Sequence, residues 1–165
     1  MLIKMKVFGL TIDPFTNVPI VILKDEQEQQ TLPVWIGVLE ASAIASELEK
    51  VQFSRPMTHD LLKEILKTTK ATVKKIEVTE LKDSVYYATI YMEVRDEGVV
   101  KMDARPSDAI AIALRANAPI YVDSSVIEQS KNVDLAQGGK KGKGSKDFLE
   151  TLEELSPGDF GKYKM

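Results

Sequence analysis

The sequence predicts an α+β domain built from two related β-β-β-α halves, with a mainly antiparallel or mixed sheet, helices packed on the sheet and a short C-terminal helical tail. Three strand-like runs precede a helix-like run in residues 1–70, and the same order recurs from residue 72 onward. A shift of 66 positions aligns EASAIASEL with PSDAIAIAL as xxxAIAxxL, which indicates an internal duplication. The 165 residues, 44% hydrophobic and 28% charged, suffice for one domain with a buried core.

The first half contains short apolar runs separated by polar, turn-forming segments, which predict consecutive antiparallel strands. The runs are MKVFGLTI (5–12), VPIVIL (18–23) and LPVWIGV (32–38). A helix is expected over EASAIASELEKV (40–51), where apolar residues recur at helical spacing. A second helix is expected over THDLLKEILKTT (58–69), with Thr58 as its N-cap. The side chains that this helix is expected to bury are Leu61, Leu62, Ile65 and Leu66.

The second half repeats this order. Its strands are expected at TVKKIEVTEL (72–81), VYYATIYMEV (85–94) and GVVKMDA (98–104), followed by a helix from Ser107 to about Arg115. The same shift of 66 places Val7 on Val73, and Asn17 on Asp83 in the two hairpin turns. The Ala-Ile helices are apolar nearly all round, so each is expected to be buried on more than one side.

The C-terminal part predicts a further strand at PIYVD and a short helical turn at SSVIEQS. The expected organisation is a domain over 1–135, a flexible Gly/Lys linker over 136–147 and a helical tail over 148–165. The segment GGKKGKGSK contains no apolar residue, which is typical of an exposed linker. The tail is too short to form a core alone, so we expect it to dock on the domain or on a partner.

Composition excludes several classes of site. The chain has no cysteine, which excludes disulfides, zinc-thiolate sites and thiol nucleophiles. No signal peptide and no membrane span are recognisable, so a cytoplasmic location and no membrane partner are expected. The net charge of −3 requires that any binding of nucleic acid be local. GxGxxG and P-loop patterns are absent, so no nucleotide cofactor is expected.

Two predicted helix starts resemble each other: RPMTHD at 55–60 and RPSD at 105–108. In one interpretation these residues only cap helices, because Ser, Thr and Asp at a helix start accept hydrogen bonds from free backbone N–H groups. Capping explains Asp103 less well, since a carboxylate at the end of an apolar strand needs a partner such as Arg105.

In the other interpretation the polar residues form a reactive centre. Asp103, Asp108 and Glu40 would then converge as oxygen ligands for Mg²⁺ or Mn²⁺, the hard cations that assist phosphodiester hydrolysis. The only histidine, His59, is the candidate general base. The residues expected to bind substrate, through charge or through helix starts, are Arg105, Arg55, Ser107, Thr58, Lys63 and Lys67.

Three segments in order, LPVWIGVLEASAIASEL, RPMTHDLL and DARPSDAIAIALRANAPIYV, resemble the bifunctional nuclease domain family, formerly a domain of unknown function and also present in plants. The resemblance covers about residues 1–135, and the ending SPGDFGKYKM is similar to the C-terminus of bacterial members. It implies an oligomeric α+β domain with nuclease activity on DNA and RNA. The positions that match the family motifs are Glu40, Arg55, Thr58, His59, Asp60, Asp103, Arg105, Ser107 and Asp108.

Three functions follow as hypotheses. The leading one is a divalent-metal-assisted nuclease that cleaves DNA and RNA and forms a homo-oligomer, with a dimer expected. The second is a non-catalytic oligomeric module for regulation or interaction, whose polar motifs only fix helix starts. The third is a small-ligand binder in which the two helix N-termini form an anion pocket, with the anion near Ser107 or Thr58.

Overall fold

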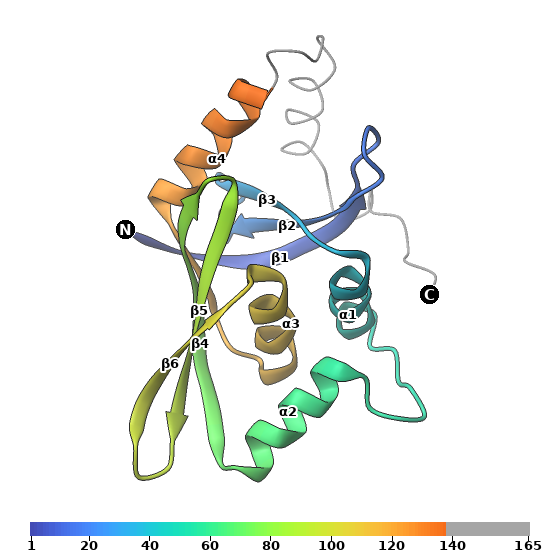
Figure 1. The fold of residues 1–165 in the computed structure, drawn as a ribbon, viewed down its shortest axis with the longest axis vertical. Coiled ribbons are helices and arrows are strands. Elements are labelled where there is room, and N and C mark those ends of the chain that lie inside the picture. Colours follow the sequence, from blue (N-terminus) through green and yellow to red (C-terminus); the bar gives the residue numbers. More distant parts are fainter. Residues whose placement is uncertain (138–165) are drawn as a thin grey trace.

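The structure is a computed structural model that describes residues 1–137, with side chains described as far as residue 132. Seven strands form one mixed sheet in the order β3-β2-β1-β7-β4-β5-β6, and helices pack on it (Figure 1). The predicted α+β class is therefore confirmed. The strands are β1 (Leu2–Ile12), β2 (Pro19–Asp25), β3 (Thr31–Trp35), β4 (Ala71–Lys82), β5 (Val85–Val94), β6 (Gly98–Ala104) and β7 (Ile120–Asp123). The helices are α1 (Val38–Leu48), α2 (Thr58–Thr68), α3 (Pro106–Ala116) and α4 (Ser124–Gln137).

The two halves of the sheet repeat each other. β1-β2-β3 and β4-β5-β6 are antiparallel meanders on either side of β7, which runs antiparallel to β1 and parallel to β4. The first strand of each half carries a β-bulge, between Val7 and Gly9 and between Val73 and Lys75, at positions related by the shift of 66. The turn residues Asn17 and Asp83 both have positive φ, 57° and 51°. These shared irregularities support the duplication more strongly than strand order does.

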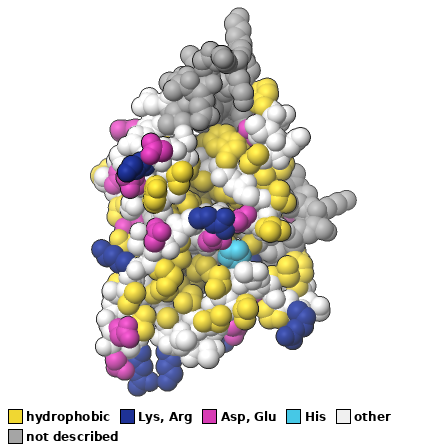
Figure 2. All heavy atoms as spheres, in the orientation of Figure 1, with side chains coloured by type: hydrophobic (Ala, Val, Ile, Leu, Met, Phe, Trp, Pro, Cys, Tyr) yellow, Lys and Arg dark blue, Asp and Glu magenta, His cyan; other side chains and the backbone are white. Residues whose placement is uncertain are grey.

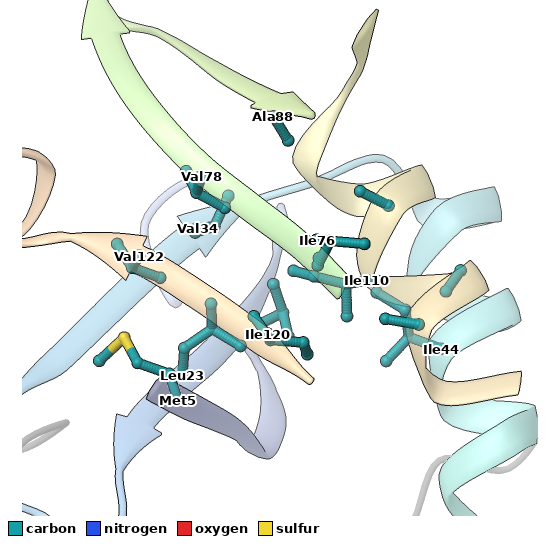
Figure 3. Close-up of a cluster of buried hydrophobic side chains, with 14 of the residues drawn as sticks. Met5, Leu23, Val34, Ile44, Ile76, Val78, Ala88, Ile110, Ile120 and Val122 are labelled. Carbon is teal, nitrogen blue, oxygen red and sulfur yellow. The ribbon is translucent and has the colours of Figure 1, made fainter. Parts of the chain in front are cut away.

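The core lies between the sheet and the Ala-Ile helices. α1 and α3 contact each other on one face of the sheet, where Ala41, Ala45 and Ala109 are buried and leave room for close approach. Figure 3 shows Ile110 of α3 close to Ile76 of β4, within the same buried cluster. The buried alanines and isoleucines of these helices are therefore packing residues, as the sequence predicts, whereas Val38, Leu39 and Leu48 of α1 are exposed.

Helix α2 is less buried than the sequence predicts. Leu66 is half-buried, but Leu61 is 54% exposed and Ile65 is 48% exposed, and Leu62 is exposed as well. The prediction of a buried stripe was wrong because helical spacing identifies an apolar face without showing that anything covers it. Thr58 is also not the N-cap: the helix is capped at Met57, whose backbone N–H donates to Asp60 Oδ2 at 3.0 Å.

Helix α4 is longer than the short turn expected from the sequence. It runs to Gln137, so the first two residues of the predicted linker are helical, and Val126 and Ile127 are buried. The rest of that linker and the tail over 148–165 lie outside the described residues. In the part of the chain that is described, no helix is both long and apolar enough to cross a membrane.

Arg115 joins the three helices on this face. Its side chain is 2% exposed; Nε donates to Asp60 Oδ1 of α2 at 2.8 Å, and Nη2 donates to the Ala43 carbonyl of α1 at 2.9 Å. Nη1 donates to the Ala111 carbonyl of α3 itself at 3.1 Å. Burial opposes ionisation of Asp60, but the hydrogen bonds from Arg115 and from the Met57 backbone outweigh it and lower the pKa of this carboxyl. Arg115 therefore holds α2 against α1 and α3.

Replacing Arg115 by methionine tests this role. Methionine has about the same length as the aliphatic part of arginine but no hydrogen-bond donor. Arg115→Met therefore leaves Asp60 Oδ1 and the Ala43 carbonyl without this donor, so the free energy of unfolding should fall by about 3 kcal/mol. Urea denaturation measures the change. The control is Arg95→Met, an exposed position where a change within about 0.5 kcal/mol is expected. Equal stability of the two variants would contradict the role given to Arg115.

The lowered pKa of Asp60 predicts a pH dependence. A carboxyl whose pKa is lower in the folded state than its unfolded value of about 3.9 stabilises the fold above that value and loses this contribution as pH falls through the folded pKa. The stability difference between wild type and Asp60→Asn should therefore be constant from neutral pH to about pH 5 and shrink below about pH 4. Urea denaturation across this range checks it, with the exposed Asp96→Asn as control. A difference that grows in acid would overturn the assignment.

Candidate functional site

The starts of α2 and α3 meet in the structure. His59, the second residue of α2, places Nε2 2.9 Å from Oδ1 of Asp108, the third residue of α3. Figure 2 shows the single histidine beside a small group of acidic and basic side chains, with hydrophobic side chains around it. The two Arg-Pro segments that resemble each other in the sequence therefore contribute to one place on the surface.

Arg105 extends this contact to the first half of the chain. Its Nε and Nη2 donate to Asp108 Oδ2 at 2.9 and 2.8 Å, and Nη2 also lies 2.8 Å from Glu40 Oε1 of α1. We call Glu40, His59, Arg105 and Asp108 the His59 cluster. Glu40 and Asp108 are each the third residue of their helix, so the duplicated halves supply equivalent acids.

Burial differs sharply within the His59 cluster. The His59 side chain is 11% exposed and the Glu40 side chain 15%, whereas Arg105 is 66% exposed and lies over both acids. The hydrogen bond and the charge of Asp108, followed by the hydrogen bond to Glu40, raise the pKa of Arg105 above its usual value. The arginine therefore stays charged and holds the two carboxylates at the surface.

The residues just before α1 and α3 help to place the side chains of Glu40 and Arg105. Arg105 has extended backbone before the helix, and Pro106 at the first helical position presets the backbone for α3. Gly37 precedes α1, and a Cβ at this position would overlap Oε2 of Glu40. A residue without a side chain at 37 therefore lets the Glu40 carboxylate fold back toward Arg105.

Several predicted residues do not join the His59 cluster. Asp103 is exposed on β6, where it lies opposite Thr89 of β5. On either side of Thr89, the side chains of Ala88 and Ile90 are buried in the core. Because side chains alternate along a strand, Asp103 lies on the face of the sheet opposite the core. Arg55 is exposed, and no ion pair involves it within the described ranges. Position in sequence beside a motif did not reveal which face of the strand Asp103 occupies.

The helix-start residues Thr58 and Ser107 differ from each other. Thr58 is exposed, whereas Ser107 is 6% exposed, and neither provides a side-chain cap for its helix. Lys63 and Lys67 lie farther along α2 and line a pocket between α2, α3 and the start of β4. Ser107 and Thr58 therefore differ in accessibility, and the anion pocket expected near one of them stays a prediction.

The geometry does not fit a metal ion held by Glu40, Asp103 and Asp108. Among the side chains that the structure describes, no three His, Asp or Glu residues lie where they could hold a metal ion. Oxygens of Glu40 and Asp108 both contact Nη2 of Arg105, so the guanidinium occupies the position between these carboxylates. As the site is arranged, one guanidinium offsets part of the negative charge of the two acids.

The sequence reasoning missed the part played by Arg115. The sequence does contain a signal for this role. A helix of alanine and isoleucine is expected to be buried, so an arginine on it needs hydrogen-bond acceptors that are buried as well. The partner Asp60 was recognisable only as a member of the RPMTHD motif. Together they place the start of α2, and with it His59, against Asp108.

Comparison with known proteins places the chain. The bifunctional nuclease domain model matches residues 21–134. An uncharacterized protein of Mycobacterium tuberculosis (strain H37Rv) is 32% identical over 163 residues, which are 95% of this chain and 97% of that protein. Bifunctional nuclease 2 of Arabidopsis thaliana is 29% identical over 114 residues (68% of this chain, 34% of that protein), and bifunctional nuclease 1 of Oryza sativa subsp. japonica is 26% identical over 109 residues (65% and 33%). This chain thus spans about a third of these plant relatives. From the domain match and the similarity to the mycobacterial protein, the chain belongs to the bifunctional nuclease domain family.

Proposed function

We propose that the protein is a nuclease that hydrolyses phosphodiester bonds in DNA and RNA, with the His59 cluster as its reactive centre. The observation that carries this proposal is the 2.9 Å contact between His59 Nε2 and Asp108 Oδ1. A carboxylate that accepts the Nε2 proton fixes the tautomer of the imidazole and leaves the lone pair of Nδ1 free. Membership of the family and the names of the plant relatives support the same activity.

The proposed reaction uses His59 as general base. Nδ1 takes a proton from a water molecule as its oxygen attacks phosphorus, and the bond from phosphorus to the leaving oxygen breaks. The proton then passes from His59 to the leaving oxygen, so the enzyme returns to its starting state. Because water is the nucleophile, the reaction needs no 2′-hydroxyl and applies to DNA as well as RNA.

Arg105 is suited to stabilise the charged transition state. A guanidinium has five N–H donors, and the described contacts to Asp108 and Glu40 use Nε and Nη2 only. Nη1 can then donate to a phosphate oxygen from an exposed position. Glu40 acts as a positioning residue that holds the guanidinium from the side of α1.

The test is cleavage of labelled DNA and RNA by the purified protein, with Mg²⁺, with Mn²⁺ and with a chelator. His59→Gln and Asp108→Asn should each lower the cleavage rate by about 10²-fold or more, because the base is lost or misoriented. The exposed variant Asp96→Asn is the control and should cleave as the wild type does.

Asp103→Asn distinguishes the His59 cluster from the carboxylate site of Glu40, Asp103 and Asp108 that the sequence predicts. Retained cleavage supports the His59 cluster, because Asp103 lies on the other face of the sheet. Loss of cleavage in Asp103→Asn with activity kept in His59→Gln would support the carboxylate site inferred from the sequence instead. Absence of cleavage by the wild type under all three conditions would refute the nuclease proposal.

A second candidate function, an oligomeric interaction module, is favoured by the apolar surface around the cluster. Nine large hydrophobic side chains between residues 38 and 65 are exposed. Figure 2 shows hydrophobic side chains on the face that carries the histidine. The nine exposed side chains are Val38, Leu39, Leu48, Val51, Phe53, Met57, Leu61, Leu62 and Ile65. Surfaces of this kind usually mark contacts with other proteins.

A second copy of the chain is the partner that we propose for this surface. α2 carries two acids, Asp60 and Glu64, and two lysines, Lys63 and Lys67, so two copies of the helix can approach without net repulsion. An isologous dimer would bury the same stripe on both copies.

Sedimentation velocity tests the dimer. The wild type should sediment as a dimer, and Leu61→Glu/Ile65→Glu should sediment as a monomer, because two carboxylates would be buried without partners. The matched control is Val85→Glu, an exposed apolar position on β5 outside this surface, which should remain dimeric. A monomeric wild type would contradict the proposal.

A further inference from the structure

A second feature of α2 lies on its charged flank. The helix, α3 and the start of β4 line an open pocket of about 280 Å³, which we call the lysine pocket. Its floor is apolar and includes Val73 and Ile112, both buried, and the half-buried Leu66 and Ala116. Its rim carries three exposed lysines, Lys63, Lys67 and Lys70.

The three lysines make no ion pair within the described structure. No ion pair with an acidic side chain is found for Lys63, Lys67 or Lys70 among residues 1–132, although lysines elsewhere, such as Lys74 and Lys75, are paired. The helix dipole favours a cation in the last turn and so accounts for Lys67. It does not account for Lys63, which lies in the middle of the helix, nor for the convergence of all three lysines on an apolar floor.

This combination selects a ligand with an apolar, flat part and at least one anionic group. Ammonium groups serve as point charges for phosphate, and aliphatic side chains can pack against the face of a nucleobase. The volume is near the lower end for small-molecule pockets, which suits one base and not a folded protein segment. In a duplex the bases are stacked and paired, so only an unpaired nucleotide can enter.

The lysine pocket is also placed to serve the His59 cluster. Lys63 lies about 6 Å and Lys67 about 12 Å farther along the axis of α2 than His59, at 1.5 Å per residue. A strand anchored at the pocket can therefore run along the helix to His59. Arg115 holds α2 in place, so the spacing between anchor and cluster is fixed by the fold.

We propose that the lysine pocket binds one nucleotide of single-stranded DNA or RNA beside the bond to be cleaved, with its base on the apolar floor and the adjoining phosphates on Lys63, Lys67 and Lys70. This inference rests on the nuclease function proposed above and names its substrate as the unpaired strand. Thr72 is the only uncharged polar side chain among the described residues that line the pocket, so the pocket selects for an unpaired base and not for a particular sequence.

Binding is measured by fluorescence anisotropy with short labelled strands whose phosphorothioate linkages resist hydrolysis. Lys63→Gln/Lys67→Gln/Lys70→Gln should weaken binding about tenfold or more and reduce the salt slope by about 2, since each phosphate contact in a single strand contributes about 0.7. The control replaces three exposed lysines outside the pocket, Lys82, Lys101 and Lys131, by glutamine and should bind as the wild type does. Equal binding by both triple variants would overturn the proposal.

An abasic strand of the same length tests the apolar floor. The wild type should bind the strand with bases more tightly, and Ala116→Leu, which fills the floor, should remove this preference while leaving the salt slope unchanged. Equal affinity of the wild type for both strands would show that no base is held there.

Cleavage of unmodified strands separates this inference from the nuclease proposal. Strand binding that depends on the three lysines, without cleavage by the wild type, would refute the nuclease and keep the pocket as a binding site. Cleavage at wild-type rates by the Lys63→Gln/Lys67→Gln/Lys70→Gln variant, at strand concentrations below saturation, would refute the pocket and keep the nuclease.

Discussion

Close packing of α1 against α3 on one face of the sheet is the constraint on which the rest of the site depends. Small side chains such as Ala41, Ala45 and Ala109 let the helices approach, and both helices emerge from the ends of meanders with the same order. Their first turns therefore come close enough for one guanidinium to reach an acid from each. The surface cluster is in this sense a product of core packing.

Electrostatics at the surface follow from that arrangement. Two acids at equivalent helix positions would repel each other, and Arg105 offsets part of this repulsion by contacting both. The acid of the second half carries an additional contact to a nearly buried histidine, which the acid of the first half lacks. The two halves therefore differ at the equivalent helix positions of Glu40 and Asp108, where Arg105 connects them.

The extent to which the sequence predicts the molecule varies with the range of the interactions. Strands, the two Ala-Ile helices and the duplication are predictable because side-chain periodicity and turn residues act locally. His59 and Asp108 were expected in one reactive centre with Glu40 and Asp103, but the direct contact between them was not predicted. The exposure of Leu61 and the contacts of Arg115 depend on which elements become neighbours, and no local pattern records that. The position of Asp103 was not predictable either, because a shift of one residue along a strand moves a side chain to the other face of the sheet.

The central position of β7 has a consequence for how the chain is made. Leu2 pairs with Asp123, so the strand that joins the two meanders is synthesised after both of them. Until it emerges from the ribosome, β1 and β4 each present an unpaired backbone edge, the kind of edge that promotes association between chains. Closing a sheet across this sequence separation is slow compared with forming the hairpins. The sheet can therefore close only after the region around residue 120 has left the exit tunnel.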